Sequence, residues 1–401
     1  MNSKKTSAMS GPYNEEKALV PRLRFPEFQD EEGWEIRPFH QLFTIGNGRD
    51  YKHLEGGDVP VYGSGGYMLS VSDHLHDGES VCIGRKGTIN NPIFLSGKFW
   101  TVDTLFYTHS FRNCLPRFIY LLFQGIDWLK HNEAGGVPSL SKANIGQIKA
   151  AVPKPSEQEK IADCLFSLDD LITEEGQKLD TLKIHKKGLM QQLFPREGET
   201  VPRLRFPEFR KAGAWAKVTA GELFSNRTER GDSGLPIYSV TTTEGLVPRA
   251  SLDRRIEDVA ESGAHKTVRK GDIAYNMMRM WQGALGIAPE DCMVSPAYIV
   301  LEPQAGVNPV FFYFMLKLPQ TLHVLTAHSR GLTEDRLRLY YDDFAKIPLR
   351  CPSPSEQERI ADSLTSVDSL ITAQLSKIDA LKIHKKSLMQ QLFPVMAEVL
   401  A

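Results

Sequence analysis

The chain has 401 residues, of which 41% are hydrophobic and 24% charged, a composition typical of globular proteins and a length sufficient for two separately cored domains. No stretch approaches the roughly 20 apolar residues that cross a bilayer, and residues 1–17 contain no signal-peptide core, so we expect neither membrane contact nor secretion. Five cysteines without a Cys-x-x-Cys spacing argue against a disulfide framework and a zinc site, and a net charge of −1 neither supports nor excludes nucleic-acid binding.

The sequence is a tandem duplication. Residues 20–28 (Val-Pro-Arg-Leu-Arg-Phe-Pro-Glu-Phe) recur unchanged as residues 201–209, and 29 of the 41 positions in residues 155–195 are identical in residues 354–394. The segments between these repeats differ far more. We therefore expect a constant frame that carries two diverged domains, the first variable domain (residues 1–154) and the second variable domain (residues 196–353).

In the first variable domain, strand-like runs at residues 80–83 and 100–107 and a short apolar helix at residues 118–124 predict mixed α+β structure. Two glycine-rich loops, residues 62–67 and 84–88, combine close backbone approach with aromatic, hydroxyl and cationic side chains. We expect them to form a ligand-contact surface that includes Tyr62, Ser64, Tyr67, Arg85, Lys86 and Thr88.

A long helix is predicted over residues 155–195 and again over residues 354–394. Ser156 precedes Glu159 by three residues, and Ser355 precedes Glu358, which is the spacing of a capping box at a helix start. A proline ends each pattern. About 39 helical residues at 1.5 Å each give a spacer of roughly 58 Å.

Apolar residues in both helices alternate at spacings of four and three, the pattern of a coiled-coil seam. Acidic residues early and basic residues late in each helix favour antiparallel pairing of the two copies. A coiled coil that only dimerises the chain is the alternative that periodicity leaves open. In either case we expect the interface to contain Ile161, Leu165, Leu168, Ile172, Leu179, Leu182 and Leu189 with Ile360, Leu364, Val367, Ile371, Ile378, Leu381 and Leu388.

The second variable domain shares anchors with the first, such as Trp215 for Trp34 and Leu223-Phe224 for Leu42-Phe43. Strand-like runs at residues 272–275 and 298–301 again precede a short apolar helix. The predicted contact residues are Tyr238, Thr241, Thr242, Asn276, Arg279 and Gln282, because Asn, Arg and Gln can pair bidentately with base edges in a major groove. For any single residue, ordinary turn chemistry on a solvated surface is the alternative.

The predicted fold class is therefore α+β, with two globular α/β domains, two long antiparallel coiled-coil helices between them and a pseudo-twofold internal repeat. Catalytic signals are weak. Residues 91–94 (Asn-Pro-Ile-Phe) lack the second proline of the amino-methyltransferase motif, and His185 and His384 have no second ligand at metal spacing. We expect no catalytic residue and no metal site in this chain.

The order of the segments resembles the specificity subunit of type I restriction–modification systems over essentially the whole chain. The resemblance is carried by Pro-Ser-Glu-Gln-Glu-[Lys/Arg]-Ile-Ala-Asp at residues 155–163 and 354–362, Arg-Phe-Pro-Glu-Phe, and Leu-Met-Gln-Gln-Leu-Phe-Pro at residues 189–195 and 388–394. It implies that the variable domains are target recognition domains, one for each half of an asymmetric double-stranded DNA target. It also implies that residues 155–195 are a spacer helix, and residues 354–401 a second spacer helix with a C-terminal tail.

The resemblance implies partners as well. Two modification subunits would methylate adenine, and ATP-driven restriction subunits would cleave, in a prokaryotic cytoplasm. Those partners would use S-adenosylmethionine, ATP and Mg²⁺, and this chain would bind no cofactor. Two other hypotheses stay open: a self-contained methyltransferase or nuclease, and a coiled-coil scaffold whose ends bind carbohydrate or protein.

Overall fold

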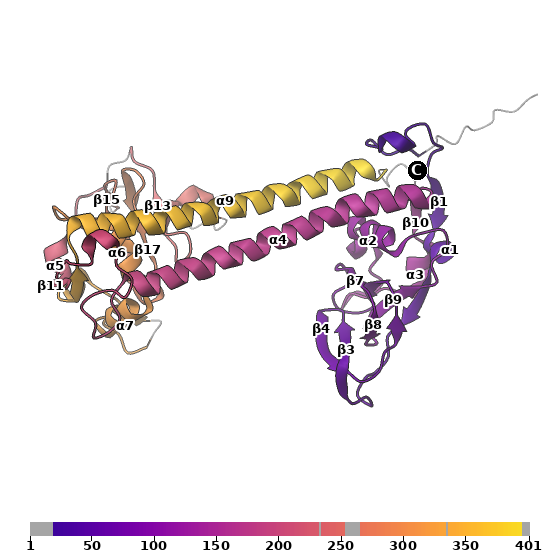
Figure 1. The fold of residues 1–401 in the computed structure, drawn as a ribbon, viewed down its shortest axis with the longest axis horizontal. Helices are drawn as coiled ribbons and strands as arrows, with labels where there is room; N and C mark the ends of the chain where they lie inside the picture. The colour runs from indigo at the N-terminus through magenta and orange to yellow at the C-terminus, as the bar shows by residue number, and fades with distance from the viewer. Residues whose placement is uncertain (1–18, 232–233, 253–264, 334–335, 395–401) are drawn as a thin grey trace, which may run out of the picture. The chain divides into compact units, whose positions relative to one another are not determined.

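The computed structural model describes residues 19–231, 234–252, 265–333 and 336–394 and divides the chain into two compact units. Unit 1 contains residues Met1–Gly176 and Lys377–Ala401, and unit 2 contains residues Gln177–Ser376. Each unit combines one variable domain with part of each long helix, α4 (Pro155–Leu193) and α9 (Pro354–Leu392) (Figure 1).

The first variable domain consists of small sheets joined by short helices. A four-stranded antiparallel sheet has the order β2-β9-β6-β7, a second sheet has the order β4-β3-β8-β5 with β3 parallel to β8, and β1 pairs with β10. In chain order the elements are η1 (Pro26–Phe28), β1 (Glu35–Pro38), α1 (Phe39–Leu42), β2 (Thr44–Asn47), β3 (Gly56–Gly63), β4 (Gly66–Val71), β5 (His76–Asp77), β6 (Ser80–Gly84), β7 (Ile93–Leu95), β8 (Lys98–Thr101), β9 (Leu105–His109), α2 (Pro116–Gly125), η2 (Trp128–His131), α3 (Lys142–Gln147) and β10 (Lys149–Val152).

The second variable domain has a four-stranded sheet of order β12-β19-β16-β17 and the pairs β11-β20, β13-β14 and β15-β18. In chain order the elements are η3 (Pro207–Phe209), β11 (Ala216–Thr219), α5 (Ala220–Leu223), β12 (Phe224–Asn226), β13 (Tyr238–Val240), β14 (Leu246–Pro248), η4 (Arg249–Ser251), β15 (Lys266–Val268), β16 (Ile273–Asn276), η5 (Met280–Gln282), β17 (Leu285–Ile287), β18 (Cys292–Val294), β19 (Tyr298–Pro303), α6 (Pro309–Leu316), α7 (Pro319–Ala327), α8 (Tyr341–Phe344) and β20 (Pro348–Cys351).

The two variable domains share one topology. The sheet β2-β9-β6-β7 corresponds to β12-β19-β16-β17, and the pair β1-β10 corresponds to β11-β20. The parallel pairing of β3 with β8 recurs as a parallel bridge between Ile237 and Met293, next to β13 and in β18. The duplication therefore extends into segments whose sequences have diverged, and the predicted mixed α/β character of both domains is confirmed.

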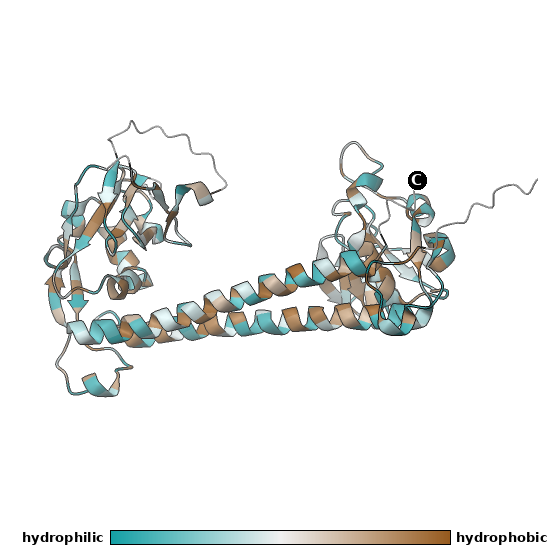
Figure 2. Cartoon of the chain, turned by 90° about the horizontal axis from the view of Figure 1, so that it is seen from above, coloured by the Kyte–Doolittle hydropathy of each residue, from teal (hydrophilic) through white to brown (hydrophobic). Residues whose placement is uncertain are grey.

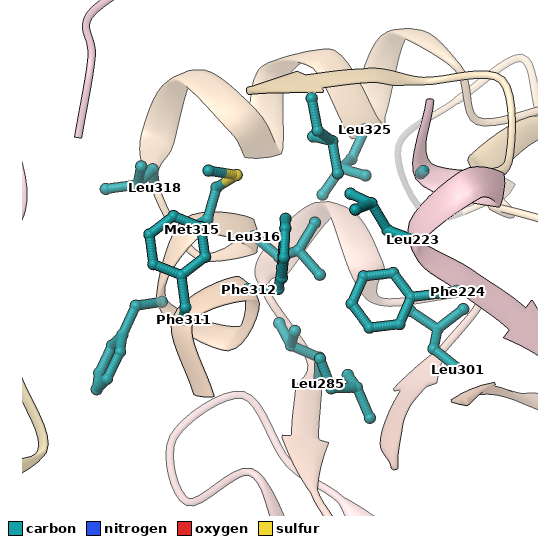
Figure 3. Close-up of a cluster of buried hydrophobic side chains, with 14 of the residues drawn as sticks. Leu223, Phe224, Leu285, Leu301, Phe311, Phe312, Met315, Leu316, Leu318 and Leu325 are labelled. Atoms are coloured by element: carbon teal, nitrogen blue, oxygen red, sulfur yellow. The ribbon is translucent and has the colours of Figure 1, made fainter. Parts of the chain in front are cut away.

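Each domain has an aromatic core that fixes its main sheet. In unit 2, side chains from α6 and α7 pack against α5, β12, β17 and β19 (Figure 3). In unit 1, α2 packs in the same way against α1 and β6. Each such buried side chain contributes about 1.5–3 kcal/mol relative to exposure, so the sheets form rigid supports for the loops at their ends. The residues labelled in Figure 3 are Leu223, Phe224, Leu285, Leu301, Phe311, Phe312, Met315, Leu316, Leu318 and Leu325.

A buried ion pair joins the Arg-Phe-Pro-Glu-Phe motif to the start of a long helix in each unit. In unit 1, the Arg24 guanidinium donates two 2.8 Å hydrogen bonds to the Glu157 carboxylate, and Trp34 Nε1 donates a third at 3.2 Å. The side chains of Arg24 and Glu157 are only 5% and 2% exposed. Arg205 and Glu356 repeat the ion pair in unit 2. The hydrogen bond to Glu157 raises the pKa of Arg24.

The glutamine that follows this glutamate is buried as well. Gln158 accepts a hydrogen bond from Leu115 N, the residue before α2, and donates to Pro153 O. Gln357 does the same in unit 2, accepting from Asn308 N before α6 and donating to Pro352 O. The identical Glu-Gln pairs thus connect each long helix to the core helix of its own domain.

The predicted capping boxes are wrong. Helix α4 begins at Pro155 and α9 at Pro354, so Ser156 and Ser355 are already the second helical residues. In α9 the cap is Ser353, whose hydroxyl accepts a hydrogen bond from Glu356 N at 3.4 Å. The repeated Ser-Glu-Gln-Glu sequence is explained instead by the buried Glu and Gln side chains.

The two long helices pack on each other in both units. In unit 1, Asp169 pairs with Lys385 at 2.7 Å and Glu175 with Lys377 at 2.5 Å, so α4 and α9 run antiparallel. In unit 2, Lys186 pairs with Asp368 at 2.6 Å. Figure 2 shows hydrophobic residues alternating with hydrophilic ones along both helices.

Every predicted interface residue is at least half-buried. The half-buried ones are Leu168, Ile172, Leu182, Leu189, Ile371, Leu381 and Leu388. The fully buried ones are Ile161, Leu165, Leu179, Ile360, Leu364, Val367 and Ile378.

Candidate nucleic-acid interface

In the first variable domain, the β3–β4 turn and the loop after β6 lie side by side. A Cβ atom placed on Gly87 would be 3.3 Å from Ser64 Oγ. Two neighbouring hollows of about 530 and 620 Å³ share Asp103 and Thr104 in their walls. The turn with Ser64 and Tyr67 lines the first hollow, and Arg85 and Lys86 line the second. The structure therefore brings the two predicted loops together.

The two tyrosines of this turn have different environments. Tyr67 is 62% exposed, and its ring meets the half-buried ring of Tyr62 edge-on, with centroids 6.1 Å apart. Tyr62 also packs against the core cluster that contains Leu105 and Phe99. Tyr67 thus offers an open ring for stacking, and Tyr62 supports it from below.

Three cationic side chains line the second hollow, together with the carboxylates of Asp103 and Glu133. Arg85 and Lys86 are exposed, and Lys142, from α3, joins them in the wall. Partial burial, with a further contribution from the charge of Arg85, lowers the pKa of Lys142. Cations held close together in this way attract the phosphate groups of nucleic acid.

Gly84 is required for the chain to turn after β6. A Cβ atom at Gly84 would lie 2.0 Å from the carbonyl oxygen of Thr88, so any side chain there would push the loop apart. This close approach places the exposed Thr88 at the end of the cationic loop, residues 84–88, which carries Arg85 and Lys86.

In the second variable domain, the equivalent loops are also adjacent. Thr241 N donates to Gly245 O in the β13–β14 turn, and a Cβ atom on Gly245 would lie 3.4 Å from Gly286 Cα in β17. Asn276 N donates to Ala284 O across the base of the loop that joins β16 to β17. The two predicted segments therefore meet at β17, as their counterparts meet in the first domain.

The predicted residues in these two segments have different roles. Thr242, Arg279 and Gln282 are exposed, which leaves their side chains open to a ligand. Asn276 Oδ1 accepts a hydrogen bond from Met278 N at 3.0 Å, and the Thr241 hydroxyl accepts one from Glu244 N at 2.9 Å. Asn276 and Thr241 therefore shape the loops that carry the exposed residues.

Tyr238 lies in the core. It is 5% exposed, and its hydroxyl donates a 2.6 Å hydrogen bond to Glu290, which together with burial raises the pKa of Tyr238 to about 12. A ring in this position has no open face for a base. Tyr238 was predicted to be a contact residue, and its enclosed ring does not support that prediction.

A third loop in each domain, which sequence reasoning did not single out, lies against the loop that follows β6 or β16. Leu140 N donates to Arg85 O in unit 1, and Leu339 N donates to Met277 O in unit 2, both at 2.9 Å. These third loops comprise residues 132–140 and the described residues 329–333 and 336–339. Their glycines gave a signal, because glycine clusters between elements predict loops, but nothing in the spacing showed their position.

The described residues offer little for catalysis. Burial raises the pKa of the Cys82 and Cys292 thiols to about 12, which disfavours the reactive thiolate. Phe94 of the Asn-Pro-Ile-Phe segment packs against Tyr120 and Phe166, so that segment contributes to a core.

The described part of the chain brings together no group of three or more His, Cys, Asp or Glu side chains suited to a metal ion. Among the same residues, every helix is too short or too polar to cross a bilayer.

Comparison with known proteins gives consistent matches. The family model described as the type I restriction modification DNA specificity domain matches residues 31–183 and 208–382. The MjaVIII specificity subunit of a type I restriction enzyme from Methanocaldococcus jannaschii is 24% identical over 349 residues, covering 81% of this chain and 77% of that protein. A putative specificity subunit from Haemophilus influenzae, S.HindORF215P, is 22% identical and covers 78% of this chain and 81% of that protein.

Solved structures agree on the fold. The type I restriction–modification S subunit from M. genitalium superposes with a TM-score of 0.62 at 15% identity, covering 94% of this chain and all of that one. A chain from a structure on complex assembly and conformational transition of the type I system has a TM-score of 0.53 at 14% identity, covering 90% of this chain and 98% of that one. With both repeats matched by the family model, the chain belongs to the type I restriction–modification DNA specificity family.

Proposed function

We propose that this chain reads an asymmetric, two-part target in double-stranded DNA, each variable domain reading one half. The observation that carries the proposal is the equivalence of the two loop surfaces. Each surface consists of three segments: the β3–β4 or β13–β14 turn, the loop after β6 or β16, and the third loop of that domain. The exposed side chains differ: Tyr67, Arg85 and Lys86 in one domain, Thr242, Arg279 and Gln282 in the other. One frame with two different surfaces suits two different half-sites.

The helices would set the distance between the half-sites. We propose that α4 and α9 form a continuous antiparallel coiled coil, with domains at residues 1–154 and 196–353 and helical segments at residues 155–195 and 354–401. Each helix has 39 residues, or roughly 58 Å, which corresponds to about 17 base pairs of duplex. Support comes from the burial of the seam and from the ion pairs at the polar positions of the two helices.

We propose that modification subunits, two in number, and restriction subunits assemble on this chain in a prokaryotic cytoplasm. Ile184 is 71% exposed and Ile383 69% exposed, and both occupy the same position of the repeated Lys-Ile-His-Lys-Lys sequence. Two equivalent exposed isoleucines, each flanked by lysines of the repeated sequence, are suited to binding two copies of one partner. Those subunits would supply S-adenosylmethionine, ATP and Mg²⁺ chemistry, and this chain would carry out recognition alone.

Genome-wide mapping of adenine methylation tests the proposal. A host that expresses this chain with its modification subunit is compared with a host that lacks only this chain. A two-part motif with a fixed gap should be methylated in the first host and unmodified in the second. Identical methylation in both hosts, with the assembled complex verified, would contradict a DNA-reading role.

A further inference from the structure

Each third loop presents an aliphatic side chain to solvent. Leu332 is 99% exposed, and Val137 in the equivalent loop is 56% exposed. Both stand next to glycine, yet the two loop sequences otherwise have little in common. Isolated exposed aliphatics are ordinary on protein surfaces. What points to a role is that the third loops of two diverged domains both carry a glycine followed by an exposed aliphatic residue.

Several contacts hold the described residues on either side of Leu332. Arg330 and Arg338 exchange backbone hydrogen bonds of 2.9 Å in both directions, and the Arg330 side chain pairs with Asp343 at 2.6 Å. A Cβ atom on Gly331 would lie 2.5 Å from Arg336 O, so this approach requires glycine. Leu332 is therefore carried outward by a braced segment.

The loop of Val137 is braced by different residues. Asn132 Oδ1 accepts hydrogen bonds from Ala134 N at 3.1 Å and Ser139 N at 2.9 Å. Gly87 N, in the cationic loop, donates to Pro138 O at 2.9 Å. In both domains an exposed aliphatic residue therefore lies near the loop after β6 or β16, although different contacts hold the two third loops.

The neighbours of both residues point to duplex DNA as the ligand. Arg85 and Lys86 lie beside the loop of Val137, and the exposed Arg279 and Arg336 lie on the loops around Leu332. Cations suit the phosphates, whereas an aliphatic side chain among them has nothing to contact on a phosphate backbone. The apolar surfaces that a duplex offers are thymine methyl groups and the faces of its stacked bases.

We propose that Leu332 and Val137 are wedges that enter the DNA base stack, one in each half-site, and kink the duplex there. This inference rests on the proposed DNA-reading function. Partial unstacking of a base step by an inserted aliphatic residue bends DNA by about 20–90°. Part of the sequence preference would then come from steps that unstack easily, pyrimidine–purine steps above all, without hydrogen bonds to those bases.

The test uses the full chain assembled with its modification subunit and an oligonucleotide that carries the mapped target. 2-Aminopurine replaces bases one at a time, outside the adenines that are methylated, because methyltransferases can extrude those bases. In the wild type, one step per half-site should brighten by about threefold or more on binding, since unstacking relieves quenching. Leu332→Ala should remove the signal from one half-site only, and Val137→Ala from the other.

Matched variants separate the possible outcomes. Leu204→Ala and Ile36→Ala remove exposed aliphatic side chains of the same two units outside the loops and should keep both signals. Leu332→Met, which keeps an apolar side chain, should retain most of its signal. A wild-type complex that binds its target without brightening, or a Leu332→Ala complex that still brightens, overturns the wedge. Failure of the wild type to prefer its target overturns the proposed function instead.

Discussion

Arg24 and Glu157 are buried together, so removing one leaves the other charge without its partner. Arg24→Met should lower the free energy of unfolding by about 3–5 kcal/mol, the cost of an uncompensated buried charge. The measurement is chemical denaturation of the full chain. Lys154→Met, which breaks the exposed pair with Glu31, is the control and should change stability little. Equal losses for the two variants would contradict a structural role for the buried pair.

Arg279 and Lys86 should differ in what they contribute to binding. Arg279→Ala should reduce discrimination between the target and a mismatch in the second half-site by about 1–3 kcal/mol, if the guanidinium reads a base edge. Lys86→Ala should weaken binding to all duplexes alike and make the slope of log affinity against log salt shallower by about 1. Binding titrations over a range of salt concentrations check both. An unchanged preference in Arg279→Ala would make this arginine a phosphate contact.

Two histidines should make unit 1 sensitive to acid. Burial lowers the pKa of both His76 and His109, with further contributions from the charge of His109 at the first and of Lys142 at the second. The unfolded chain therefore binds protons that the folded chain excludes. Stability is fully present above the unfolded histidine pKa of about 6.5 and declines as the pH falls below it.

Thermal unfolding at pH 7.5 and pH 5.5 measures this effect. The decline on acidification should be smaller in a His76→Gln, His109→Gln double variant than in the wild type. The exposed His185 supplies the control, because His185→Gln should leave the decline unchanged. Equal declines in the wild type and the double variant would contradict the histidine origin.

Residue types and spacing predicted some of these side-chain environments and missed others. Tyr67, Arg85 and Arg279 are exposed as expected, because loops carry exposed polar and aromatic groups, and their contact with DNA stays a prediction. Tyr238 could not be distinguished from them, since its burial depends on Glu290, a residue 52 positions away. The partnership of Glu157 with Arg24 spans 133 positions, so a local capping motif was the only interpretation that the sequence allowed.

At the scale of elements, the prolines predicted where the long helices end, whereas the capping boxes misplaced where they begin. The long helices end at Leu193 and Leu392, two residues before the prolines that predicted their ends. The third loops were missed because their place depends on hydrogen bonds from Leu140 and Leu339 to a separate loop. The position of a loop depends on the order of the strands in the sheet, and the sequence of one segment does not determine that order.

The exposed isoleucines of the long helices should contribute to partner binding. Ile184 is 71% exposed and Ile383 69% exposed in the chain without partners. Ile184→Asp and Ile383→Asp each place a charge at the centre of one proposed docking surface. Each variant should lose one of two modification subunits, and the double variant both, because a buried unpaired charge opposes association. Sedimentation of the assembled complex reads the stoichiometry, and unchanged helicity confirms that the helices persist. A double variant that still binds two subunits would place the docking surface elsewhere.

At the scale of the whole molecule, the proposed spacer makes the gap between half-sites a matter of helix length. The unit boundary crosses α4 after Gly176 and α9 after Ser376, and Glu175 and Lys377 pair beside it. Inserting one heptad at both points keeps the alternation of seam residues, because seven residues are two turns of a coiled coil. Each helix lengthens by about 10.5 Å, so the methylated motif should keep both half-sites and gain about 3 base pairs in its gap.

A heptad in only one helix is the informative control for this prediction. It shifts Asp169 away from Lys385 or Lys186 away from Asp368 and leaves one helix longer than its partner. Assembly or methylation should then fail, whereas the paired insertion remains active with a longer gap. Methylation mapping reads both results in one experiment. A paired insertion that methylates the original motif would mean that the helices do not measure the distance, and the spacing would then have to be set by the partner subunits.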